Sequence, residues 1–133
     1  MQKYNNTPTE DVEQVQLFTW AQYMSGKYPE LELMYHIPNG GKRSKAEAGR
    51  FKAMGVKSGV PDIFIPCARG GYFGCYIEMK RAKGGTVSAN QKKWIEALKE
   101  QGYFVVVAYG MEQAAKYIEE YMKKSKTKEK FIC

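Results

Sequence analysis

Two acidic residues and one lysine occupy positions that suit metal-assisted hydrolysis. Asp62 opens one apolar run of the sequence, and Glu78-Met79-Lys80 closes the next. Alternate side chains of a strand point to the same face, so Glu78 and Lys80 share a face, and a hairpin between the two runs brings Asp62 near Glu78. Two close carboxylates repel each other, and a divalent cation such as Mg²⁺ relieves that repulsion.

Such a cation can acidify a bound water for attack on a phosphodiester. Lys80 could then orient that water or stabilise charge on the phosphate in the transition state. The alternative is an ordinary surface salt bridge from Glu78 to Lys80 or Arg81. An Asp followed by Glu-x-Lys is a short pattern that recurs by chance, so its surroundings decide between the two interpretations.

The elements that would position these residues are marked by capping boxes, turn residues and apolar runs. We expect helices over residues 8–24, 45–54, 89–101 and 112–124, and strands over 33–37, 62–66, 72–80 and 103–109. The strand over 103–109 is apolar throughout, which predicts a central place in the sheet. This order of elements predicts the α/β class, as a single compact domain with a mixed sheet and helices on both faces.

Length and composition exclude several classes of protein. The chain has 133 residues, 44% of them hydrophobic and 14% aromatic, which fits one domain with a real core and not a disordered chain. No apolar run approaches the ~18 residues of a membrane span, and the polar N-terminus lacks a signal-peptide core. Three cysteines without Cys-x-x-Cys spacing argue against a zinc site or a disulfide scaffold. We therefore expect a cytoplasmic protein with free thiols and no membrane contact.

The charge of the chain is concentrated in three stretches. Residues 42–57 contain six basic residues and one acidic residue, residues 80–93 contain five basic residues and no acidic one, and residues 123–130 contain five basic residues and one acidic residue. The formal net charge of the chain is +7. Segregation of this kind indicates a polyanionic partner, and nucleic acid is the first candidate. The alternative is a set of solvated helix faces and a solubilising tail.

Five short motifs surround the candidate residues. They are His36-Ile37-Pro38-Asn39-Gly40-Gly41-Lys42-Arg43, Gly55 with Gly59-Val60-Pro61-Asp62, Tyr76-Ile77-Glu78-Met79-Lys80, Ser88-x-x-Gln91-x-x-Trp94 and Gly102-Tyr103. In this order, after an acidic helix start, they resemble the VRR-NUC family, a branch of the PD-(D/E)xK nuclease superfamily. The resemblance runs from about residue 10 to residue 121. Several linked motifs in order are far more specific than any one of them.

The resemblance implies a metal-dependent DNA nuclease with a restriction-endonuclease-like fold. Asp62, Glu78 and Lys80 match the acidic pair and the lysine of the superfamily, so we expect Mg²⁺ or Mn²⁺ bound by Asp62 and Glu78. For stand-alone members the resemblance also implies branched DNA, such as four-way junctions, as the substrate. We expect a homodimer, because a small nuclease that acts on two strands usually needs two active sites. The nuclease-like domain would span 1–124, with a basic and flexible tail over 125–133.

The alternative function is a basic nucleic-acid-binding module without catalysis, which would use the same phosphate contacts. Such a module has no need for an acidic pair and a lysine together, and this argument favours the nuclease.

Two further positions keep alternatives open. Glu10 and Glu13 are both candidates for the family's helix glutamate, since each lies toward the apolar stripe of the first predicted helix, although Glu10 can instead close a capping box with Thr7. Gln91 either caps the helix that starts at Ser88 or, as the family pattern implies, lies beside the metal, where its amide holds a water or phosphate.

The loop before the second predicted helix is a candidate phosphate-binding segment. Glycines allow backbone N–H groups to approach a phosphate, and cations and a helix N-terminus add positive potential. The alternative is a plain turn. The lone His36 is more often structural on an apolar strand, so it stays outside the catalytic set. The proposed nucleic-acid contacts are Asn39, Gly40, Gly41, Lys42, Arg43, Arg81 and Lys83.

Overall fold

Helices and strands alternate along the residues that the computed structural model describes, which are 8–38 and 44–127. In chain order they are α1 (Glu10–Met24), the 3-10 helix η1 (Pro29–Leu33), β1 (Tyr35–His36), α2 (Lys45–Ala53), β2 (Ile63–Ile65), β3 (Cys75–Lys80), α3 (Ala89–Glu100), β4 (Phe104–Tyr109) and α4 (Met111–Met122). Apart from η1, this is the succession predicted from the sequence. The proposed phosphate-binding residues 39–43 lie outside the described residues.

The sheet has the strand order β1-β2-β3-β4. The pairs β1–β2 and β2–β3 are antiparallel, and β3–β4 is parallel, which confirms the predicted mixed sheet and the predicted hairpin. The central place predicted for the strand over 103–109 is wrong, because β4 lies at an edge of the described sheet. Its apolar residues reflect burial of both its faces, since α4 packs on one and α3 on the other.

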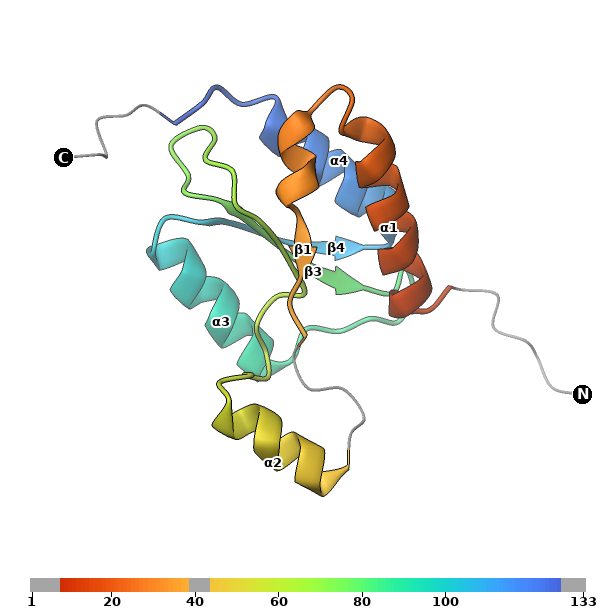
Figure 1. Ribbon diagram of the computed structural model, residues 1–133, viewed down its shortest axis with the longest axis vertical. Coiled ribbons are helices and arrows are strands. Elements are labelled where there is room, and N and C mark those ends of the chain that lie inside the picture. The colour runs from red at the N-terminus through yellow and green to blue at the C-terminus, as the bar shows by residue number, and fades with distance from the viewer. Residues whose placement is uncertain (1–7, 39–43, 128–133) are drawn as a thin grey trace, which may run out of the picture.

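Helices cover both faces of the sheet, as predicted (Figure 1). On one face the core joins α1, α4 and the inward residues of β2 and β3, and its fully buried members include Leu17, Ile63, Ile77, Ile118 and Tyr121. On the other face α3 packs over β4, where Ile95 and Val105 are buried. Helix α2 contributes no buried residue to either layer.

The start of α1 differs from the prediction. The helix begins at Glu10, and Thr9 is the N-cap, with its hydroxyl accepting a hydrogen bond from the backbone N–H of Val12. The expectation that Pro8 is the first helical residue and that Glu10 closes a capping box is therefore wrong, because Thr9 supplies the cap. Thr7 lies outside the described residues.

Residues 125–127, the first part of the predicted tail, contact the turn between β2 and β3. The backbone N–H of Gly70 donates to the carbonyl of Ser125, and the hydroxyl of Thr127 donates to the carbonyl of Tyr72. Cys67 and Cys75 are buried free thiols, as expected. Within the described ranges, every helix is too short or too polar to cross a membrane.

Candidate active site

The β2–β3 hairpin brings the two predicted carboxylates together. Ile63 pairs with Ile77, so the next opposed pair along the hairpin is Asp62 and Glu78. The Asp62 carboxylate accepts a hydrogen bond of 2.8 Å from the backbone N–H of Met79, which holds it against the end of β3. The charge of each carboxylate therefore acts on the other at close range.

Glu78 and Lys80 project from the sheet face that α3 covers, and both side chains are buried, with 2% and 8% of their surface exposed. The Lys80 ammonium lies 3.4 Å from Oε1 of Glu78 and donates a 2.9 Å hydrogen bond to Oε1 of Gln91. The Gln91 amide nitrogen donates in turn to Oε1 of Glu78 at 2.8 Å. Lysine, glutamine and glutamate thus form a closed triangle beneath the first turn of α3.

Gln91 makes the capping contacts that the sequence predicts and also contacts two of the candidate site residues. Its side-chain oxygen accepts from the backbone N–H of Ser88, and the Ser88 hydroxyl accepts from the backbone N–H of Gln91, which completes a capping box at the start of α3. The same amide contacts Lys80 and Glu78. Capping therefore positions this side chain at the carboxylate pair.

Burial makes ionisation of the carboxylate pair unfavourable. Loss of hydration first, and then the charge of Asp62, raise the pKa of Glu78 to about 8, against the opposing effect of Lys80. The pKa of Asp62 is also raised, chiefly by burial, against the opposing hydrogen bond from Met79. Glu10 at the start of α1 raises the pKa of both groups by its charge.

These residues fit a divalent cation. Oε2 of Glu78 is buried and has no hydrogen-bond partner among the described residues, which is costly for a carboxylate oxygen unless a cation binds it. No group of three His, Cys, Asp or Glu side chains in ranges 8–38 and 44–127 could hold a metal. Mg²⁺ is commonly bound by one or two carboxylates, with water and phosphate oxygens completing its ligands, and Asp62 and Glu78 match that requirement.

The structure separates the two candidate helix acids. Glu10 begins α1, and its carboxylate acts electrostatically on Asp62 and Glu78. Glu13, three residues later, is 8% exposed, and its carboxylate accepts a hydrogen bond from the backbone N–H of Met111. Glu13 therefore supplies the cap that Gly110 cannot give to α4, and Glu10 is the acid on the side of the candidate site.

His36 is a neighbour of the site that the sequence interpretation set aside. Its Nδ1 lies 2.9 Å from the carbonyl oxygen of Asp62, so Nδ1 carries the proton of that hydrogen bond. The charge of the imidazole lowers the pKa of Asp62. Pairing of β1 with β2 places His36 opposite Ile63, one residue from Asp62, and this pairing is the signal that could have found it.

Arg81 and Lys83 follow the end of β3 and lie in the loop that leads to α3. Gly85 lets this loop pass close to the site, because a Cβ at Gly85 would lie 2.9 Å from Cβ of Lys80. Arg81 is half-buried and Lys83 is exposed. The loop places two cations next to Glu78 and Lys80 in the chain, and their contact with DNA stays a prediction.

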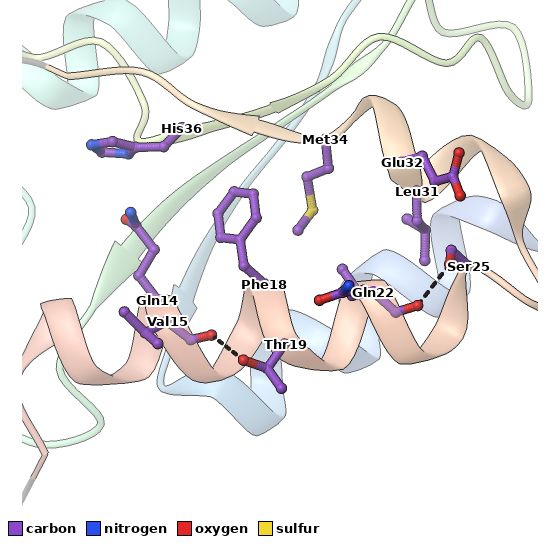
Figure 2. Close-up of a pocket in the computed structure, with 11 residues that line it drawn as sticks. Gln14, Val15, Phe18, Thr19, Gln22, Ser25, Leu31, Glu32, Met34 and His36 are labelled. Atoms are coloured by element: carbon purple, nitrogen blue, oxygen red, sulfur yellow. Dashed lines mark hydrogen bonds between the residues drawn. The ribbon is translucent and has the colours of Figure 1, made fainter.

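A groove of about 610 Å³ runs between α1 and the segment formed by η1 and β1. Figure 2 shows Phe18 and Met34 lining its middle, with His36 at one end near Gln14. Because His36 contacts Asp62, the groove begins beside the candidate site.

Both the sequence and the fold of this chain match proteins of one family. The family model of the VRR-NUC domain matches residues 4–112. This chain belongs to the VRR-NUC domain family. A solved structure described as a VRR_NUC domain protein is 35% identical to this VRR-NUC domain, with a TM-score of 0.80 over 92% of this chain and 94% of that chain. The predicted fold and family are therefore confirmed, and the family name indicates a nuclease-type protein. No curated protein matches the chain.

Proposed function

We propose that this VRR-NUC domain is an endonuclease that uses Mg²⁺ or Mn²⁺, bound by Asp62 and Glu78, to hydrolyse phosphodiester bonds in DNA. The observation that carries the proposal is the buried Oε2 of Glu78, which has no hydrogen-bond partner in the described part of the chain and lies beside a second carboxylate and a buried lysine. A module that only binds DNA gains nothing from this arrangement, because a buried carboxylate with a raised pKa destabilises the fold at neutral pH.

Each side chain has a definable task in this reaction. When bound, the cation supplies Lewis acidity, which stabilises charge on the phosphate and acidifies water. The buried Lys80 ammonium, fixed by Gln91 and Glu78, stabilises the negative charge that develops on the phosphate in the transition state. The N–H of Met79 holds Asp62 in a ligating position. Glu10, on the same side, is the proposed acid that orients the attacking water.

Branched DNA, such as a four-way junction, is the proposed substrate, and a homodimer is the proposed assembly. The support for a second copy is that several large apolar side chains of α1, η1 and β1 are exposed, and that one of them, Val15, lines the groove. The exposed side chains are Val12, Val15, Tyr23, Leu33 and Tyr35. Exposed apolar surface is often buried in protein interfaces. Two copies would present two active sites to the two strands of a branched substrate.

The test is incubation of the protein with linear, flap and four-way-junction DNA, with and without Mg²⁺ or Mn²⁺. We expect cleavage only with metal and fastest on the junction. Asp62→Asn and Glu78→Gln should abolish cleavage and leave DNA binding largely intact, because other residues contact the phosphates. The matched control is Glu96→Gln, an exposed acid on α3, which should cleave normally.

Undiminished cleavage by the purified Asp62 or Glu78 variant would reject the assigned site. DNA binding without cleavage of any substrate would favour the non-catalytic binding module. Analytical ultracentrifugation tests the dimer, and a monomer at cleaving concentrations would reject it.

A further inference from the structure

Helix α2 stands apart from the two layers of the domain. None of its nine residues, Lys45–Ala53, is buried by any part of the chain that the structure describes. In Figure 1 it lies below the N-terminal end of α3, clear of the sheet and of the α1–α4 layer. A helix this short is only marginally stable in water without tertiary packing, so the fold of this single chain gives α2 little support.

The exposed residues of α2 are sorted around the helix. At 100° per residue, Lys45 and Lys52 lie on the same side, one behind the other, and Ala48 and Gly49 lie between them. Arg50 lies on the opposite side of the helix, together with Glu47. The result is a face of small residues with a lysine at each end, which is a shape and charge that suit an extended anion approaching closely.

Gly49 is the residue of α2 that the domain itself does not require. A Cβ built on it would meet no described atom within 4 Å, and the residue does not have the positive φ that favours glycine. Glycine inside a helix is unfavourable relative to alanine, because it loses more backbone freedom on folding. Close approach of a partner to this face would explain why a side chain is absent here.

The segment after α2 ties the helix to the candidate site. The Asn90 amide donates to the carbonyl of Ser58 at 3.0 Å, and Gly59 fits against Asn90 with a φ of +90°, where a Cβ would lie 2.6 Å from the Asn90 amide nitrogen. Asn90 directly precedes Gln91, and the segment continues into Asp62. The segment that follows α2 is therefore anchored beside the carboxylate pair, and α2 precedes this segment directly in the chain.

We propose that α2 is a DNA-binding arm, whose basic face of small residues lies against the phosphate backbone of duplex DNA next to the scissile bond. The proposal rests on the proposed function, in which this chain acts on DNA. Lys45 and Lys52 are about 10 Å apart along the helix axis, which spans about three phosphate steps of one strand. The two lysines can therefore contact separate phosphates while Gly49 allows the backbone between them to approach.

Charge complementarity favours DNA over a second copy of the chain at this face. The chain carries a formal net charge of +7, and an identical α2 would present the same cations. Like charges repel, whereas phosphates release counterions when they meet lysine, which drives association. The only acid of α2, Glu47, lies on the side away from the small residues.

The decisive variant is Lys45→Ala with Lys52→Ala, which keeps the helix because alanine has the highest helix propensity. Duplex binding is measured over a salt series in the Glu78→Gln background, which prevents cleavage. The slope of log affinity against log salt should fall by about two, and the affinity should fall about 60-fold at 0.1 M salt. The matched control, Lys27→Ala with Lys116→Ala, removes two exposed lysines, one after the end of α1 and one on α4, and should leave both quantities unchanged.

A second variant tests the close approach without changing charge. Gly49→Leu introduces a helix-forming side chain into open space, so circular dichroism should show the fold retained, while duplex affinity falls at least fivefold with an unchanged salt slope. Unchanged affinity in both α2 variants, or no DNA binding by the parent protein, would overturn the inference. A dimer lost in the lysine variant without a change in salt slope would also overturn it and assign the face to a second copy.

The failure of the proposed function has a different signature. If the wild-type chain shows no metal-dependent cleavage, the proposed nuclease function is rejected, and the salt dependence of DNA binding still tests whether α2 contacts DNA. Conversely, a cleaving wild-type enzyme whose α2 variants bind normally keeps the nuclease and rejects the arm. The lysine variant should raise the KM for DNA more than it lowers kcat, because α2 contributes binding and does not contact the reacting phosphate.

Discussion

Replacing Glu78 with glutamine should change how the stability of the metal-free protein depends on pH. The pKa of Glu78 rises from an ordinary value of 4.5 to about 8 on folding, chiefly because burial removes its hydration. Between these two values the folded protein retains a proton that the unfolded chain has released. The free energy of unfolding of the wild-type protein must therefore fall as pH rises through this window.

The size of the effect follows from the shift. One pKa unit corresponds to about 1.4 kcal/mol, so this one group should lower the free energy of unfolding by on the order of 3 kcal/mol between pH 5 and pH 8. Glu78→Gln removes the titrating group and keeps a similar shape. The stability of the variant should decline less over the same range, with a residual decline because Asp62 also has a raised pKa.

The assay is urea unfolding in EDTA at pH 5, 6.5 and 8, which yields the free energy of unfolding if the urea dependence is the same for both proteins. Glu96→Gln on the surface of α3 is the control, because its parent side chain is 76% exposed and should leave the wild-type pH profile unchanged. Parallel pH profiles for the wild type and Glu78→Gln would refute the reasoning, since they would mean that Glu78 ionises as easily in the folded protein as in the unfolded chain.

Four other substitutions test single residues in or near the site. Lys80→Ala should slow single-turnover cleavage about 100-fold at saturating metal, as expected for a group that stabilises the transition state, and a wild-type rate would remove Lys80 from the mechanism. Glu13→Ala should lower stability by about 1 kcal/mol in urea unfolding through loss of the α4 cap, whereas Glu10→Ala should mainly slow cleavage; the reverse pattern would exchange their roles. Gln91→Glu keeps a capping-box residue but adds charge beside Glu78, so cleavage should need higher pH while helix content is unchanged, and an unshifted pH–rate profile would contradict this.

The parts of the fold that the sequence predicted correctly depend on local signals. Turn residues and two apolar runs define the β2–β3 hairpin, and its register then places Asp62 opposite Glu78. The capping pair Ser88 and Gln91 defines the start of α3. In each case the residues that determine the structure are close in the chain, so a single sequence contains the information.

The errors and open alternatives concern contacts between distant segments. The apolar run of β4 predicted a central strand, but β4 is an edge strand of the described sheet. An apolar run indicates that helices cover both faces of a strand, as α3 and α4 do here, and does not indicate how many strands pair with it. Glu10 and Glu13 lie less than one turn apart, so only the packing of α1 against α4 separates them. His36 reaches Asp62 only because β1 pairs with β2.

Gln91 shows why capping and chemistry need not be alternatives at this site. The capping box fixes the Gln91 side chain through bonds with Ser88, so little rotamer freedom remains to be lost when the amide holds Lys80 and Glu78. A catalytic group held by a side chain that local structure has already ordered is preorganised, and preorganised groups stabilise a transition state without reorganisation during the reaction. The start of α3 therefore does more than terminate a loop: it sets the position of the ammonium that the proposed mechanism directs at the phosphate.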